Sequence, residues 1–217
     1  MFNFIEKLKR MGYIPDTILD VGAHRGDWTG KMIKIYPNAN YYLFEANKYN
    51  YSRFNNHNNI TVINEILNDK IEEVDWYQNF GTGDSFFKEK TKFFVNTIPI
   101  KKTTTTLNTI LDKDNFLKDL KNIFLKVDCQ GAEIPIIKGS TNILSSVDFI
   151  VIEMPFFGQY NEDVPDFLQH IQFMDSIGFV PFDLVEKHYI KKFNMQVDIL
   201  FINKNHKFNE LVQQTIL

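Results

Sequence analysis

The sequence is poor in cysteine, in long apolar runs and in clustered charge of either sign. Its only cysteine is Cys129, which excludes a disulfide within the chain and is typical of a reducing compartment such as the cytoplasm. No apolar run approaches the eighteen residues that argue for a membrane-spanning helix. Residues 1–12 contain apolar side chains at helical spacing with charged ones between them, which excludes a secretory signal and predicts an N-terminal helix.

Charge is balanced along the chain. The 24 lysines and arginines against 27 aspartates and glutamates give a formal net charge of -3, and neither sign forms a block. A protein that tracks a nucleic-acid backbone usually carries a basic patch, so the sequence argues against a nucleic-acid partner. The 217 residues suffice for one well-buried domain and are few for two. We therefore expect a single domain over residues 1–217.

Segments typical of strands and of amphipathic helices alternate along most of the chain. The expected strands are residues 17–21, 40–45, 60–63, 123–128, 149–153, 179–184 and 197–202. The expected helices between them are residues 27–36, 49–54, 107–120, 134–144 and 164–177. This order predicts an α/β fold of three layers with a mostly parallel, seven-stranded sheet. A loop at residues 187–194 is the only connection between the last two strands, so the final strand should run antiparallel.

Residues 65–102 interrupt this alternation. Residues 73–78 and 93–98 alternate in the manner of strands, and a glycine-rich loop at residues 81–84 separates them. We interpret residues 65–102 as a β-rich insertion at the edge of the sheet or over a site.

Four of the expected strands end in a carboxylate, at Asp20, Glu45, Asp128 and Glu153. Because the carboxyl ends of parallel strands line one crevice, we expect these acids to converge there. The first strand continues directly into residues 22–27, a turn with two glycines that opens a helix. Such a turn places backbone N–H groups where a nucleotide-like ligand can bind.

The side chains of this turn favour S-adenosylmethionine over a dinucleotide. The dinucleotide fingerprint is G-x-G-x-x-G, whereas this turn has His24 at the second glycine position and Asp27 at the third. S-adenosylmethionine has no phosphate, and a crevice rich in carboxylates attracts its sulfonium and its ammonium. Glu45 suits either ligand, because both present ribose hydroxyls to an acceptor.

Several motifs together resemble the FkbM-type methyltransferases, over residues 17–203. The matching segments are residues 20–27, 44–46, 64, 106–108, 125–133, 138–139 and 197–201, of which the stretch KVDCQGAE at residues 126–133 is the most specific. The sequence departs from the family at His24, Asn108 and Ala46, where the family often has asparagine, aspartate and proline. The resemblance implies a Rossmann-like class I methyltransferase fold and S-adenosylmethionine as the cofactor.

The resemblance also implies which residues bind this cofactor. The turn after the first strand would hold the methionine moiety, and it comprises Asp20, Gly22, Ala23, His24, Gly26 and Asp27. Glu45, followed by Ala46, would bind the ribose, and the adenine would lie against Asn64, Glu65 and Ile66. Asp128 would lie beside the sulfonium and the methyl acceptor, with Glu133 at the start of the next helix.

Methyl transfer to a hydroxyl requires alignment of the reactants and a base that takes the proton. Asp128 is the first candidate for this base, followed by Glu153 and Glu133, while His24 and His188 are weaker candidates. A divalent cation held by Asp128 and Glu153 is an alternative that would lower the pKa of the acceptor. No compact ligand motif is present, so the sequence leaves the metal ligands open.

The leading hypothesis is an S-adenosylmethionine-dependent O-methyltransferase that acts, as a monomer or homodimer, on a hydroxyl of a carbohydrate or similar small natural product. A nicotinamide-dependent oxidoreductase is a second hypothesis, which His24 and Asp27 disfavour. A binding module that has kept the fold and lost turnover is a third, and the intact acids argue against it.

Overall fold

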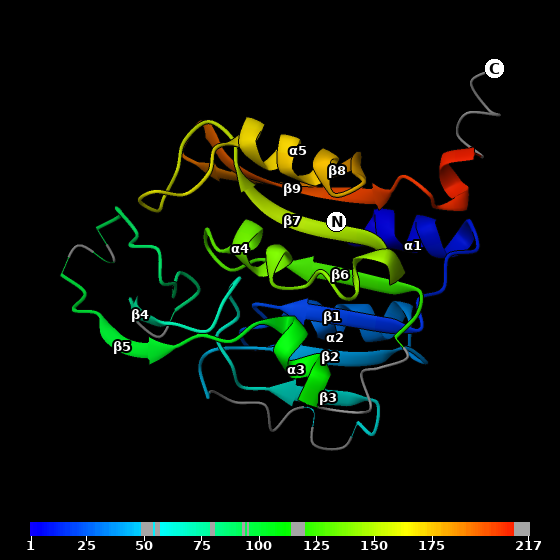
Figure 1. The fold of residues 1–217 in the computed structure, drawn as a ribbon. Coiled ribbons are helices and arrows are strands. Elements are labelled where there is room, and N and C mark those ends of the chain that lie inside the picture. The colour runs from blue at the N-terminus through cyan, green and yellow to red at the C-terminus, as the bar shows by residue number, and fades with distance from the viewer. Residues whose placement is uncertain are drawn as a thin grey trace.

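A computed structural model describes residues 1–48, 54, 57–78, 81–92, 94, 96–113 and 120–210. Its main sheet has seven strands in the order β3-β2-β1-β6-β7-β9-β8 (Figure 1). The strands are β1 (Thr17–Val21), β2 (Asn40–Phe44), β3 (Ile60–Ile63), β6 (Ile123–Val127), β7 (Val147–Pro155), β8 (Phe179–Ile190) and β9 (Phe193–Asn203). The first five of these pair in parallel, and β9 runs antiparallel to both of its neighbours. The predicted sheet with an antiparallel last strand is therefore confirmed.

Helices cover both faces of this sheet. On one face lie α1 (Phe2–Arg10) and α2 (Asp27–Ile35), and on the other lie α3 (Leu107–Lys113), α4 (Glu133–Lys138) and α5 (Phe167–Ser176) (Figure 1). A hydrophobic core lies on each face of the sheet, and alternate strand residues point into one or the other. Phe124 packs with α1 and α2, whereas Leu125 and Val127 pack with the other three helices. Burial on both faces explains why these strands are continuous apolar runs.

Two described helices are shorter than predicted. The helix predicted at residues 134–144 is α4, which ends at Lys138 and is followed by turns and by a short 3₁₀ helix at Leu144–Ser146. α5 begins at Phe167, later than predicted, because Asp166 caps it by accepting a hydrogen bond from the Gln169 backbone N–H. The helix predicted at residues 49–54 lies outside the described residues except for Phe54, and residues 114–119 of the helix predicted at 107–120 lie outside them too. In the part of the chain that is described, no helix is long and apolar enough to cross a membrane.

Two predicted segments are wrong. Residues 187–194 are not a loop, because β8 and β9 stay paired as far as Ile190 opposite Phe193, with Lys191 at the turn in a left-handed conformation (φ 56°). β8 is an edge strand, so its last residues can be charged and exposed, which is why the sequence of this segment is typical of a loop. The described residues of the segment 93–98, which omit 93 and 95, form no strand.

The second strand of the insertion is instead β5 (Ile100–Thr103), which pairs antiparallel with β4 (Glu73–Trp76) in a separate two-stranded sheet. In Figure 1 the arrowheads of β1 and β6 point toward this small sheet. Trp76 of β4 also lines a cavity together with residues that follow β1 and β2. The insertion therefore stands over the carboxyl edge of the main sheet.

At this edge the turns after β1 and β6 touch each other at Gly22. A Cβ atom on Gly22 would lie 1.9 Å from the carbonyl oxygen of Asp128, and Gly22 itself has a φ of 77°. The Asp128 N–H donates to the carbonyl oxygen of Val21 at 3.1 Å. Only glycine allows this approach without moving one of the two turns.

We expect Gly22→Ala to destabilise the fold more than Gly178→Ala. Both glycines have a positive φ, but a Cβ on Gly178 (φ 88°) meets nothing within 4 Å. The control should therefore cost about 1 kcal/mol for backbone strain alone. Gly22→Ala should cost about 1–3 kcal/mol more, because the clash forces backbone shifts. Urea unfolding followed by circular dichroism measures both, and equal losses would contradict the proposed close contact.

Candidate active site

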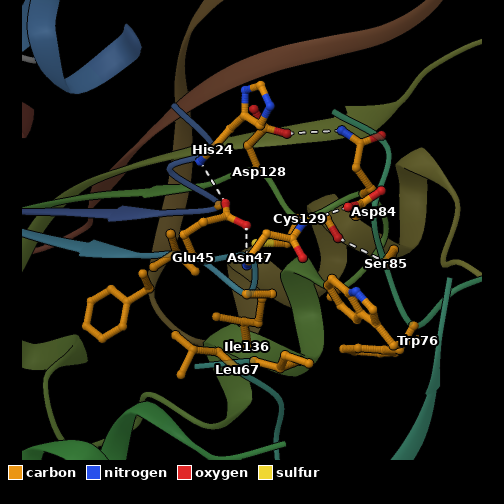
Figure 2. Close-up of a pocket in the computed structure, with 18 of the residues that line it drawn as sticks. His24, Glu45, Asn47, Leu67, Trp76, Asp84, Ser85, Asp128, Cys129 and Ile136 are labelled. Carbon is orange, nitrogen blue, oxygen red and sulfur yellow. Dashed lines mark hydrogen bonds between the residues drawn. The ribbon is translucent and has the colours of Figure 1, made fainter. Parts of the chain in front are cut away.

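Two hollows meet at the carboxyl edge of the sheet. The first, here called the inner cavity, has about 600 Å³ of empty space and is drawn in Figure 2. The second, the outer cleft, is wider and has about 1870 Å³. Gly22, His24, Asp128 and Gln130 line both. A ligand in the inner cavity and a ligand in the outer cleft would therefore face each other at Asp128.

The inner cavity combines an apolar floor with one polar edge. Leu67 and Ile136 lie at its base, and Trp76 stands across from Glu45 (Figure 2). The Glu45 carboxylate accepts hydrogen bonds from the backbone N–H groups of His24 at 2.7 Å and of Asn47 at 2.9 Å. Burial raises the pKa of Glu45 although these N–H groups oppose the shift. This arrangement suits a flat ring with hydroxyl groups at one end.

Polar contacts tie the insertion to the turn after β2. The Asn47 amide donates to Asp84 at 2.6 Å and accepts from Gln78 at 2.6 Å. Directly before the insertion, the Asn64 amide donates to the backbone oxygen of Glu45 at 2.7 Å. The insertion is thus a wall of the inner cavity as well as a cover.

Carboxylates dominate the outer cleft. Glu153, at the end of β7, accepts hydrogen bonds from the Gln130 amide at 2.8 Å and from the Gln196 amide at 3.1 Å, both at Oε2. Burial and then the charge of Asp128 raise the pKa of Glu153. The His188 Nε2 lies 3.1 Å from Asp198 Oδ1 and 3.8 Å from Glu153 Oε1. The hydrogen bond to Asp198 raises the pKa of His188 against the opposing effect of burial.

A buried ion pair lies beneath the point where the two hollows meet. The Lys126 ammonium donates to Asp20 Oδ1 and to the Gly22 carbonyl oxygen, each at 3.1 Å, and lies 3.5 Å from Asp128 Oδ2. Burial alone would lower the pKa of Lys126, but the charges of Asp20 and Asp128 raise it. The second oxygen of Asp20 accepts from the Thr29 hydroxyl at 2.6 Å. Asp20 is completely buried, so it positions the turn and lines neither hollow.

Glu133 is also a buried residue that shapes a turn. Its carboxylate accepts from the backbone N–H groups of Cys129 at 2.8 Å and of Gly131 at 3.0 Å. Burial raises the pKa of Glu133 to about 7 and also raises the pKa of the Cys129 thiol. Because Glu133 lines neither hollow, its geometry gives it no access to an acceptor.

The structure brings most of the predicted site residues to the two hollows. The inner cavity or the outer cleft is lined by Gly22, Ala23, His24, Asp27, Glu45, Ala46, Glu65, Ile66, Asp128 and Glu153. Asn64 lines a shallower pocket next to Glu65 and Ile66. Asp20, Gly26 and Glu133 line none of these. The roles of all these residues toward a ligand stay predictions.

Sequence reasoning gave no role to several residues of the site. Trp76 and Asn47 enter the inner cavity from the insertion and from the turn after β2, and no local pattern marks them. Asp198 is different, because it is an acid inside the apolar run of β9, and an acid in a buried strand is a signal for a functional role.

Comparisons with known proteins agree with this architecture. The sequence matches the Methyltransferase FkbM domain family over residues 16–181. The crystal structure of methyltransferase FkbM from Methylobacillus flagellatus KT is similar, with a TM-score of 0.53 and 16% identity. The similarity covers 85% of this chain and 43% of that protein, so this chain spans less than half of its length.

A second similar structure is an S-adenosylmethionine-dependent methyltransferase from Clostridium acetobutylicum ATCC 824. Its TM-score is 0.52 at 9% identity, and the similarity covers 92% of this chain and 89% of that one. No curated protein matches the chain. At these low identities the two solved structures are evidence for the fold alone. They confirm the expected Rossmann-like class I methyltransferase fold.

We expect Lys126→Met to lower the free energy of unfolding by about 3–5 kcal/mol, because it leaves the Asp20 carboxylate buried without a counter-ion. The double variant Asp20→Asn, Lys126→Met should recover more than half of that loss, since no buried charge is then left without its partner. Urea unfolding of the wild type, both single variants and the double variant gives the coupling energy. Additive effects of the two substitutions would show that the pair does not stabilise the fold as a unit.

Proposed function

Because the chain belongs to the FkbM methyltransferase domain family, we propose that it is an S-adenosylmethionine-dependent O-methyltransferase. Its acceptor in this proposal is a hydroxyl of a carbohydrate or similar small natural product. The observation that carries the proposal is the meeting of an apolar cavity and an acidic cleft at Asp128. Such a pair of sites suits a cationic methyl donor on one side and a hydroxylated acceptor on the other.

The residues of the inner cavity fit the adenosine part of the cofactor. Leu67, Ile136 and Trp76 offer apolar surface to the adenine, and Glu65 and Ile66 lie beside them. Each Glu45 oxygen already accepts one backbone N–H and keeps acceptor capacity for a ribose hydroxyl. The residues that line this cavity, in the described part of the chain, include no lysine or arginine, which disfavours a pyrophosphate.

The residues of the outer cleft fit the charged end of the cofactor. When bound, S-adenosylmethionine supplies a methyl group on a positively charged sulfur. The carboxylates of Asp128, Glu153 and Asp27 line this cleft and favour a cation there. Asp20 would act indirectly, by holding Lys126 and through it the Gly22 carbonyl and Asp128.

Asp128 is the proposed base for the acceptor hydroxyl. It lines both hollows, and its side chain is 37% exposed, so its carboxylate is accessible from the cleft. The Gln130 amide donates to Asp128 Oδ1 at 3.2 Å and so orients it. Glu153 lines the cleft as well and is the second candidate, whereas burial removes Glu133 from this role.

The lining of the outer cleft supports a small hydroxylated acceptor. Carboxylates accept hydrogen bonds from hydroxyl groups, and the aromatic ring of Tyr160 offers a flat surface to a sugar. A nucleic acid fits poorly, because acids outnumber bases among the residues that line the cleft. Phe94 and the loop at residues 81–83 belong to the insertion, so the insertion would help to exclude water during transfer.

We expect the protein to bind S-adenosylhomocysteine at least about tenfold more tightly than NAD⁺, measured by titration calorimetry. Glu45→Gln should weaken this binding about 10–100-fold, because hydrogen bonds to a charged group contribute about 1.5–3 kcal/mol. Glu73→Gln is the control, since Glu73 is exposed on β4 and lines neither hollow. Tight binding of NAD⁺ without binding of S-adenosylhomocysteine would favour an oxidoreductase instead.

We expect Asp128→Asn to keep the affinity for S-adenosylhomocysteine within about tenfold and to lower methyl transfer by at least about 100-fold, as for loss of a general base. A radiolabelled-methyl assay over a panel of glycans, lipids and small phenols identifies the acceptor and then measures the rate. Asp175→Asn, on the surface near Lys204, is the matched control. Unchanged turnover of the Asp128 variant would remove this residue from the mechanism, and absence of transfer to every acceptor would favour a non-catalytic module.

A further inference from the structure

We propose that Glu153, His188 and Asp198 form a binding site for a first-row divalent metal ion in the outer cleft. The three residues come from the neighbouring strands β7, β8 and β9 (Figure 1). Glu153 lies directly opposite Asp198 across β7 and β9, and His188 lies opposite Gln196 across β8 and β9. The strand register therefore assembles the site from residues that are far apart in the sequence.

The distances within this trio are close to those between the ligands of a metal ion. One possible ligand atom from each residue lies within 4.8 Å of the other two. The His188 Nε2 is 3.1 Å from Asp198 Oδ1 and 3.8 Å from Glu153 Oε1. Ligand bonds of about 2.0–2.2 Å in a tetrahedral site place ligand atoms roughly 3.3–3.6 Å apart. A metal ion would need only small side-chain shifts to bind all three.

The two oxygens of the largely buried Glu153 carboxylate have different surroundings. The Gln130 and Gln196 amides both donate to Glu153 Oε2. Among the residues that the structure describes, no N–H group donates to Oε1, whose neighbour is His188 at 3.8 Å. The Glu153 side chain is only 10% exposed. The two glutamines thus hold the carboxylate in the orientation of a ligand, as hydrogen-bonding groups around metal sites do.

The negative charges around the trio also favour the binding of a cation. Asp198 is 7% exposed, and the charge of Asp128 acts on both Glu153 and Asp198. Lys126 of β6, which also lines the cleft, is already bonded to Asp20. Buried carboxylates need a counter-charge, and a divalent ion with His188 as a neutral ligand provides it.

This ligand set differs from the pair predicted from the sequence, Asp128 with Glu153. Asp128 lies 3.5 Å from the Lys126 ammonium, which competes with a metal for the same oxygen. One imidazole nitrogen with two carboxylates suits Mn²⁺ or Zn²⁺ better than Ca²⁺ or Mg²⁺, which prefer oxygen ligands alone.

The function of the metal ion rests on the proposed methyltransferase activity, while its binding does not. A metal ion at the trio would have an open position toward the cleft, where the acceptor hydroxyl could bind as a further ligand. Coordination lowers the pKa of a hydroxyl, so its O–H bond breaks more easily and the proton passes to the Asp128 carboxylate. The metal would thereby position the acceptor oxygen and increase its nucleophilicity.

The test is a titration of the chelator-treated full chain with Mn²⁺, followed by electron paramagnetic resonance, and with Zn²⁺, followed by calorimetry. We expect one site, weakened at least about tenfold by His188→Gln and by Asp198→Asn. Asp175→Asn is the control, because Asp175 is exposed beside Lys204 and lines neither hollow, and it should change the affinity by less than threefold. His188 is on an edge strand and 35% exposed, so its variant should fold, which circular dichroism verifies.

The proposed metal site would be overturned if neither Mn²⁺ nor Zn²⁺ bound, or if all variants bound the metal with equal affinity. Calorimetry with S-adenosylhomocysteine on the same samples separates this result from the proposed function. Binding of S-adenosylhomocysteine without metal binding would reject the metal site alone. Metal binding without S-adenosylhomocysteine binding would keep the metal site and reject the methyltransferase function.

Discussion

The site depends on one buried ammonium group. Lys126 on β6 joins Asp20 on β1, the carbonyl oxygen of Gly22 and the carboxylate of Asp128. Removing a lysine and an aspartate from water costs several kcal/mol per ion, and the fold offsets this cost only because the ammonium has several acceptors in place. The same contact sets how close the turns after β1 and β6 approach, and the missing side chain of Gly22 allows it. The junction of the inner cavity and the outer cleft follows from this packing.

Carboxylates of the same chemical type have different roles because their surroundings differ. Glu133 is buried under the turn after β6, where its carboxylate oxygens accept hydrogen bonds from backbone N–H groups, so it stabilises this turn. Glu45 also accepts two backbone N–H groups but faces the inner cavity, so it can both hold a turn and bind a ligand. Asp128 and Glu153 face the cleft, where burial and the charge of Asp128 raise the pKa of Glu153, and a cation bound there would oppose both effects. Position near a strand end thus does not decide which role a carboxylate has in the site.

The fold was predictable from the sequence because its strands are buried on both faces, as Phe124 and Leu125 illustrate, and such strands are apolar runs. The convergence of strand-end acids was predictable from topology alone. Three features could not be predicted from the sequence. The Asp20 carboxylate is buried against Lys126, β8 continues through the charged residues near His188, and β4 pairs with residues 100–103. Each depends on contacts between segments distant in the sequence, and no local periodicity records which strand pairs with which, or in what register.

The two halves of the site are therefore built by different means. The inner cavity is formed largely by the short turns that directly follow β1, β2 and β6, where sequence motifs are compact and a resemblance to a family is easily recognised. The outer cleft is formed by the insertion, by the end of β7 and by the paired strands β8 and β9, which meet only through tertiary packing. Exposed positions on the edge strand β8 can change without loss of the core, since their side chains contact solvent and the cleft. In the proposed function the inner cavity holds the cofactor, so substitutions in β8 and β9 would change which acceptor the outer cleft binds and leave cofactor binding intact.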